Sequence, residues 1–235
     1  MSESVVYGWG RRAAMAPGAV YALILLGLIF TLFTDEFLTL YNLTNIGIQG
    51  SVLIILSLGM TLIILSEGID LSLGPVLGLA GVVLALAVKH QVGLPLAILA
   101  AIAVGGTFGA LNGVLISYLG LPPFVVTLGT FGAAQGLALV LTEGSSIPDL
   151  GPAVQYFHDG QILGIRVPIV MTAIVFLVVH VILYHTKFGT YVFAIGGNQE
   201  ALTLAGVRAR LYKMGVYVLG GSLAAVAALV MTARM

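Results

Sequence analysis

Long apolar stretches, separated by short polar segments, restrict the possible folds of this chain more than any other feature. A helix that crosses the hydrocarbon core of a bilayer needs about 20 apolar residues, and each stretch reaches or approaches this length. The stretches are Pro17–Phe33, Ile46–Ser66, Leu71–Val88, Leu94–Tyr118, Pro123–Thr142, Val167–His185 and Met214–Ala233. They predict an all-α integral membrane protein, a polytopic bundle of about seven spans that forms one transmembrane domain over residues 1–235.

The scarcity of charge supports this prediction. Only 8% of the residues are charged, with nine basic and nine acidic side chains, whereas soluble domains carry about 25%. So few charges cannot cover the surface of a soluble domain, and a lipid bilayer is the expected surrounding. The formal net charge is zero, so no basic field indicates a nucleic-acid partner. The chain has no cysteine, which excludes disulfides, thiolate metal sites and cysteine nucleophiles.

The positions of lysine and arginine predict the orientation, because cytoplasmic loops carry an excess of both. With a cytoplasmic N-terminus, the inner segments contain Arg11, Arg12, Lys187, Arg208, Arg210 and Lys213. The outer segments contain Lys89, Arg166 and Arg234. We therefore expect the N-terminus and residues 186–213 to be cytoplasmic, and residues 143–166 to be outside.

The junction between the second and third stretches is unusually short, since only residues 66–70 separate them. A tight cytoplasmic turn and a helix broken within the membrane both fit. Gly68, Gly74 and Pro75 suit a break, which requires protein or a water-filled cavity to satisfy the irregular backbone.

Polar residues in or beside the apolar stretches are candidates for lining a substrate pathway, because they are costly inside a membrane. These candidates are Asp70, Ser72, Asn112 and Thr127. Structural roles are the alternatives: Asp70 can cap the helix that follows it, and Asn112 can bond a neighbouring helix. Gly105, Gly109 and Gly113 recur every four residues beside Asn112, and such a stripe allows another backbone to approach closely.

The chain carries no predicted metal or nucleotide site. His180 and His185 are five residues apart on an expected helix, which turns them about 140° away from each other. No other histidines and carboxylates have metal-ligand spacing, and no Gly-Lys pair exists for a phosphate-binding loop. We expect no enzyme activity, no metal and no bound cofactor in this chain, with any nucleotide hydrolysis on another subunit.

The polar segment of residues 186–213 contains a short helix signal. Asn198 is a good N-cap, Glu200 places negative charge in the first turn, and Gly206 is a good C-terminal stop. They predict a helix of about two turns, roughly 10 Å long. Its small apolar residues suit a groove on a partner protein, and an interfacial helix lying on the lipid headgroups is the alternative.

Several short sequence motifs occur in a fixed order along the chain. They lie at residues 42–46, 59–62, 68–74, 112–113, 124–129, 188–191 and 194–207. In this order they resemble the permease subunits of ATP-binding cassette (ABC) importers of the ribose/galactose/xylose/arabinose type, a family that includes autoinducer-2 permeases. The resemblance covers nearly the whole chain from about Leu38.

The resemblance implies a permease subunit that moves a monosaccharide-like solute across a bacterial inner membrane. It also implies two ATP-binding subunits that bind ATP and Mg, a periplasmic sugar-binding protein, and a second permease protomer in a homodimer or heterodimer. It assigns coupling with the ATPase to Gly197, Asn198, Glu200, Ala201 and Gly206. The sugar remains undefined. A passive channel or secondary carrier for a small polar solute is the alternative function, and it would need coupling-ion carboxylates deep in the spans.

The family continues beyond the position of Met235 with further spans. We therefore expect the chain to be truncated at its C-terminus and unable to transport by itself. Gly220 and Gly221 call for a close helix partner, which we expect to lie in that missing region.

Overall fold

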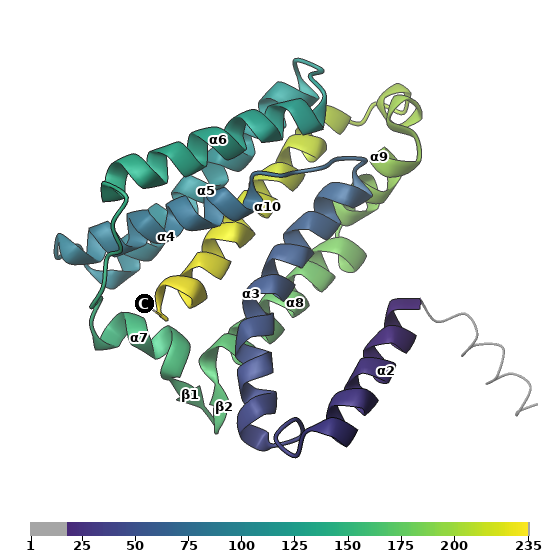
Figure 1. The fold of residues 1–235 in the computed structure, drawn as a ribbon. Coiled ribbons are helices and arrows are strands. Elements are labelled where there is room, and N and C mark those ends of the chain that lie inside the picture. Colours follow the sequence, from purple (N-terminus) through teal and green to yellow (C-terminus); the bar gives the residue numbers. More distant parts are fainter. Residues whose placement is uncertain (1–17, 235) are drawn as a thin grey trace, which may run out of the picture. The chain divides into compact units, whose positions relative to one another are not determined.

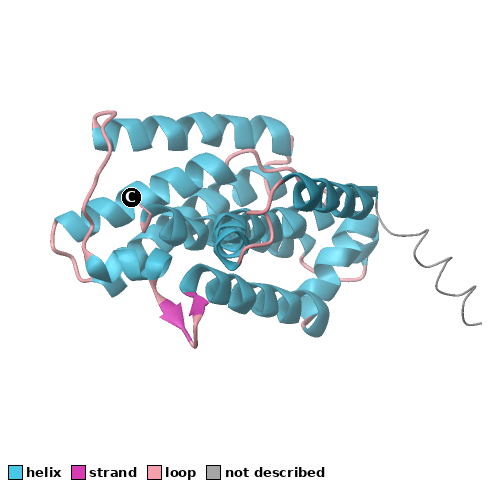
Figure 2. Cartoon of the chain, turned by 60° about the horizontal axis from the view of Figure 1, so that its bottom comes forward, coloured by secondary structure: helices cyan, strands magenta, loops and turns pink. Residues whose placement is uncertain are grey.

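A computed structural model of the protein describes residues 18–234, so Arg11 and Arg12 lie outside the described residues. The chain forms two compact units, residues 1–46 and 47–235, which we treat separately. The helices are α2 (Gly18–Phe33), α3 (Leu40–Leu65), α4 (Leu73–Lys89), α5 (Leu94–Ser117), α6 (Pro123–Thr142), α7 (Pro152–Asp159), α8 (Val167–His185), α9 (Lys187–Leu204) and α10 (Ala209–Thr232) (Figure 1). Strands β1 (Gln161–Ile162) and β2 (Ile165–Arg166) form a small antiparallel hairpin, drawn in magenta in Figure 2.

The predicted all-α membrane fold is confirmed, and each of the seven apolar stretches forms a helix. In the described part of the chain, five helices are long and apolar enough to cross a membrane, namely α3, α5, α6, α8 and α10. Helices α2 and α4 are apolar but shorter, at 16 and 17 residues. The protein is therefore a multi-pass membrane protein.

The N-terminal unit contains α2 and the first turns of α3. None of the residues of α2 is buried, although all but a few are apolar, as expected for a helix that faces lipid. The Thr39 hydroxyl accepts a hydrogen bond from the backbone N–H of Asn42 at 3.2 Å. This contact satisfies a free amide in the first turn of α3.

The core of the second unit is the contact of α10 with α4 and α5. The glycine stripe of α5 lies directly against α10, as the sequence predicts. A Cβ on Gly109 would overlap the carbonyl group of Tyr217, and a Cβ on Gly113 would lie 2.9 Å from the Cα of Met214. The small residues thus let the two backbones touch, which is how helices gain dispersion energy in a membrane.

The expectation that the partner of Gly220 and Gly221 lies outside this chain is wrong. A Cβ on Gly221 would overlap the backbone of Gly105 on α5, and one on Gly220 would lie 2.8 Å from Cδ1 of Ile63 on α3. Two sides of α10 are thus covered by different helices. Sequence spacing shows that these glycines need neighbours, but only the packing shows which helices supply them.

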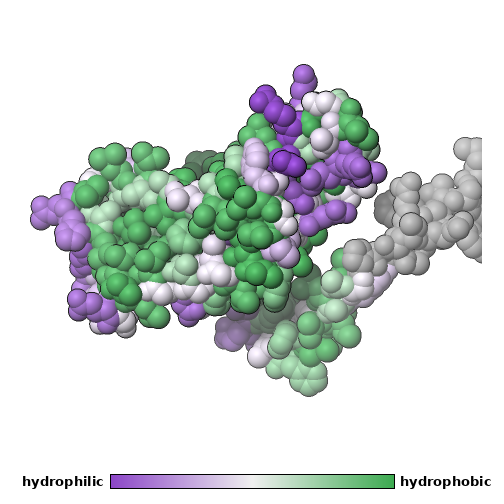
Figure 3. Space-filling view, turned by 90° about the horizontal axis from the view of Figure 1, so that it is seen from above, coloured by the Kyte–Doolittle hydropathy of each residue, from purple (hydrophilic) through white to green (hydrophobic). Residues whose placement is uncertain are grey.

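The surface of the molecule is largely apolar. Figure 3 shows a face dominated by hydrophobic residues, with hydrophilic residues gathered near its edges. Leu53 of α3, Leu99 of α5 and Val140 of α6 are among the large exposed apolar side chains, each more than 60% exposed. This distribution is the one that a lipid solvent favours.

The polar segment of residues 143–166 is folded. Val154 of α7 is buried with Leu150, and both pack against Ala85 of α4 and Ala233. The Arg166 guanidinium donates a hydrogen bond to the Asp159 carbonyl at 2.6 Å. The segment therefore closes one end of the second unit around α4 and α10.

Candidate functional site

The connection between α3 and α4, residues 66–72, begins with a turn and continues as half-buried irregular chain, and we call it the extended segment. Residues 66–72 are not helical: Ser66 and Glu67 form the turn that ends α3, with Glu67 at a φ of +56°, and Figure 1 shows a long irregular stretch of chain between the two helices. Buried residues alternate with exposed ones along it: Ser66, Gly68, Asp70 and Ser72 are buried, and Glu67, Ile69 and Leu71 are exposed. One side of the segment therefore faces the protein interior.

Asp70 is the charged group that this segment buries. Its side chain is only 2% exposed. One carboxylate oxygen accepts hydrogen bonds from the backbone N–H of Ser72 at 2.8 Å and from the Ser72 hydroxyl at 2.6 Å. The other oxygen accepts a bond from the Asn112 amide at 3.3 Å. A buried carboxylate requires such donors, because an unpaired one would be very costly.

Asn112 of α5 connects three parts of the bundle. It is fully buried, and its amide nitrogen also donates to the Ser72 hydroxyl at 2.9 Å. Its amide oxygen accepts from the Thr130 hydroxyl of α6 at 2.8 Å. We call the set Asp70, Ser72, Asn112 and Thr130 the buried polar network. It ties the extended segment to α5 and α6.

The network contains three of the four predicted pathway residues. Thr127 is buried but separate, because its hydroxyl bonds backbone carbonyls of its own helix, Pro123 at 2.8 Å and Phe124 at 3.5 Å. Thr130 was not predicted, although it lies one turn beyond Thr127 on the same helix. Asp70 is not the N-cap of α4, because Ser72 occupies that position. Asp70 instead orients the start of the helix by binding Ser72.

The segment of residues 186–213 is more helical than the sequence suggests. Helix α9 runs through most of it and bends at Asn198, whose φ of −164° and ψ of 95° are not helical. The part before the bend packs inward, with Val192 and Ile195 buried. The part after it, residues 199–204, is the predicted short helix, which we call the coupling helix after the role that the family resemblance implies for it.

Both ends of the coupling helix are capped as predicted. The Asn198 side-chain oxygen accepts a hydrogen bond from the Ala201 N–H at 2.8 Å. At the other end, Gly206 has a φ of +82°, a left-handed conformation that favours glycine. The five residues assigned to coupling, Gly197, Asn198, Glu200, Ala201 and Gly206, are all exposed. They therefore form a surface that a partner could contact.

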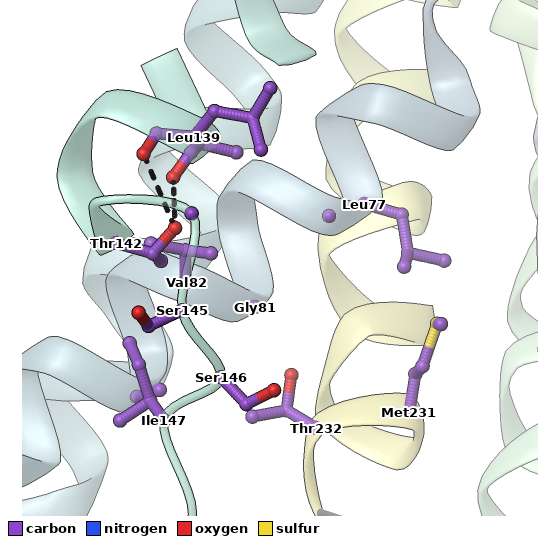
Figure 4. Close-up of a pocket in the computed structure, with 14 residues that line it drawn as sticks. Leu77, Gly81, Val82, Leu139, Thr142, Ser145, Ser146, Ile147, Met231 and Thr232 are labelled. Carbon is purple, nitrogen blue, oxygen red and sulfur yellow. Dashed lines mark hydrogen bonds between the residues drawn. The ribbon is translucent and has the colours of Figure 1, made fainter. Parts of the chain in front are cut away.

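A cavity of about 330 Å³ lies between α4, α6, α10 and residues 144–147. Figure 4 shows Leu77, Leu139 and Met231 around it, with Ser146 and Thr232 directed toward each other. Its lining includes none of the predicted pathway residues. The cavity and the buried polar network are therefore separate features.

The two histidines of α8 are closer than their spacing predicts. The ring centroids of His180 and His185 lie 5.7 Å apart, and the ring centroid of Tyr184 is 4.9 Å from that of His180. Among the described residues, no three histidine, cysteine or carboxylate side chains form a group that could hold a metal ion.

A polytopic bundle with a buried polar network and an exposed, capped helix is compatible with a membrane permease, and the comparisons with known proteins identify that class. Residues 42–235 match the family described as the branched-chain amino acid transport system / permease component, and the chain belongs to this family. The resemblance to the permeases of ABC sugar importers is thereby confirmed.

Curated relatives cover almost the whole chain. The ribose import permease protein RbsC of Escherichia coli K12 is 36% identical over 225 residues, which are 94% of this chain and 70% of that protein. The D-allose transport system permease protein AlsC of the same strain is 33% identical, over 93% of this chain and 68% of its own length. The fructose import permease protein FruF of Bifidobacterium longum is 35% identical, with coverages of 92% and 65%. No solved structure matches the chain.

Proposed function

We propose that this chain is the permease subunit of an ATP-driven importer for a monosaccharide, located in the inner membrane of a bacterium. The observation that carries this proposal is the similarity, along 94% of the chain, to a protein named as a ribose import permease. The allose and fructose permeases among the relatives widen the substrate class to monosaccharides in general. A channel or secondary carrier is disfavoured by the same relatives.

The coupling helix is proposed to dock on separate ATP-binding subunits. Six residues of isolated helix are unstable in water, and here two caps and the preceding part of α9 hold them in place. Ala201 is exposed and has a small side chain, so a groove on a partner subunit could fit closely against this side of the helix. The chain has no Gly-Lys pair for a phosphate-binding loop, so the partner subunits would bind ATP and Mg. A sugar-binding protein in the periplasm and a second permease protomer complete the proposed transporter.

The buried polar network is proposed to position the extended segment beside the transport pathway. Its donors and acceptors are directed at one another, which supports a structural role for Asp70, Ser72 and Asn112. Thr127, one turn from the network, would then line the pathway independently of it.

Reconstitution in liposomes tests the proposed function. The permease is combined with the ATP-binding and sugar-binding proteins of its source organism, and uptake of labelled ribose, allose and fructose is measured with and without ATP. We expect uptake of at least one sugar that depends on ATP. Ala201→Arg, which adds a long side chain to the exposed coupling helix, should abolish sugar-stimulated ATP hydrolysis.

The matched control is Gln161→Arg, which adds the same side chain to an exposed position on the hairpin. This variant should behave as the unsubstituted protein does. Sugar uptake that proceeds at the same rate without ATP would instead favour a channel or carrier.

A further inference from the structure

The end of α3 is in backbone contact with α9, two residues before the bend. A Cβ on Gly196 would overlap the carbonyl oxygen of Leu65, the last residue of α3. No side chain separates the two backbones at this point. The extended segment begins at the next residue, Ser66, so the start of that segment and the start of the coupling helix are held together.

Lys213 of α10 makes a second connection between the same two elements. Its ammonium group donates a hydrogen bond to the side-chain oxygen of Gln199, the first residue of the coupling helix, at 3.4 Å. The exposed carboxylate of Glu67 in the extended segment attracts it electrostatically, without an ion pair within 4 Å. Lys213 is half-buried but Glu67 is exposed, so water screens part of this attraction.

The same face of α10 continues along the extended segment. Tyr217 lies one turn after Lys213, where side chains four residues apart share a helix face. Its hydroxyl is directed at Gly68, where a Cβ would lie 2.5 Å from the hydroxyl oxygen. Three residues further on, Gly220 contacts Ile63. Helix α10 therefore packs against both the extended segment and the end of α3.

We propose that Gly196 and Lys213 transmit displacement of the coupling helix to the extended segment and, through Asp70, to the buried polar network. The inference rests on the proposed function, because it names the route by which ATP hydrolysis would act on the bundle. When Gly196 moves toward α3, it displaces the backbone of Leu65. When Gln199 moves away, it draws Lys213 with it through their hydrogen bond, and Lys213 in turn attracts Glu67. Both are positioning residues that need not touch the sugar.

The connection can be measured in the permease alone. The chain has no cysteine, so spin labels can be placed at Leu204→Cys on the coupling helix and Ile69→Cys on the extended segment, both exposed positions. Double electron–electron resonance spectroscopy then gives the distribution of distances between the two spin labels. We expect the distribution to broaden or shift with Lys213→Met and with Gly196→Ala.

Two control variants should leave the distribution unchanged. Arg210→Met removes an exposed charge from the same helix as Lys213, and Gly132→Ala adds a methyl group with nothing within 4 Å beyond its chain neighbours and its own helix backbone. A distribution that is the same in Lys213→Met, Gly196→Ala and the unsubstituted protein would overturn the proposal.

The functional effect of this transmission is measured as the number of sugar molecules imported per ATP hydrolysed. Lys213→Met should lower this ratio at least about five-fold, the lower end of typical coupling factors between sites, whereas Lys213→Arg and Arg210→Met should retain it. The exchanged pair Lys213→Glu with Glu67→Lys should restore much of it, because the Gln199 amide can donate as well as accept. A purely structural loss would not be restored by exchanging the charges.

Failure of the inference and failure of the proposed function give different results. An unchanged ratio in Lys213→Met, with ATP-dependent uptake by the unsubstituted transporter, overturns the transmission and leaves the proposed function intact. Absence of ATP-dependent uptake by the unsubstituted transporter contradicts the proposed function and the transmission together. The spin-label distances still decide whether the physical connection exists.

Discussion

Gly105 of α5 and Gly221 of α10 face each other so closely that a Cβ on either would overlap the carbonyl oxygen of the other. The contact continues through Gly109 with Tyr217 and Gly113 with Met214. As the α5 numbers rise, the α10 numbers fall, so the two helices run antiparallel. Lipid tails are as apolar as leucine, and close packing of small residues is therefore a main source of stability for this pair.

Gly109→Ala should destabilise the fold. The new methyl group would overlap the Tyr217 carbonyl, and overpacking costs about 1–3 kcal/mol. In a chain of this size that corresponds to a fall of about 2–12 °C in the midpoint of thermal unfolding, measured in detergent. Gly106→Ala is the control, since its Cβ would meet only the Ser222 hydroxyl at 3.4 Å. An equal fall in both variants would contradict the assigned contact.

Asn112→Asp should disrupt the buried polar network despite its similar size. The substitution replaces the donor that serves Asp70 and Ser72 with an oxygen and places a second carboxylate beside Asp70. The loss of a buried charged hydrogen bond costs about 3 kcal/mol or more, so the yield of monodisperse protein should fall sharply. Thr127→Val, which removes a hydroxyl bonded to its own helix, should cost about 1 kcal/mol. Similar yields for the two variants would count against the network.

Asp70→Asn should retain the fold and most transport. The remaining side-chain oxygen can still accept both hydrogen bonds from Ser72, and the Asn112 bond that is lost is the longest of the three, at 3.3 Å. Asp70→Leu leaves the Ser72 and Asn112 donors without this acceptor and should prevent assembly. The measurements are size-exclusion chromatography and ATP-dependent sugar uptake. A well-folded Asp70→Asn protein without uptake would show that the negative charge itself serves transport.

Asn198→Ala should loosen the coupling helix without affecting the bundle. Loss of an N-cap costs about 1 kcal/mol, which corresponds to roughly five-fold faster hydrogen exchange of the amides of residues 199–204. Asn198→Ser should restore most of the protection, because serine caps almost as well. Unchanged exchange in Asn198→Ala would show that packing of α9, rather than the cap, holds the helix.

Local features of the sequence were sufficient to predict the helices and the caps. Hydropathy over about 20 residues defines a membrane helix regardless of its neighbours, so all seven apolar stretches were found. The cap at Asn198 and the left-handed Gly206 involve residues three to five apart. The spacing of Gly105, Gly109 and Gly113 also indicated a contact surface, because it depends only on the helical repeat.

The tertiary structure alone decided which distant residues meet. Asn112 bonds Asp70 across 42 residues and Thr130 across 18, and nothing in the local sequence distinguishes Thr130 from Thr127. The choice depends on how α6 is rotated against α5, which is set by the fit of many side chains at once. For the same reason, the neighbours of Gly220 and Gly221 and the position of Lys213 beside Gln199 could not be read from spacing.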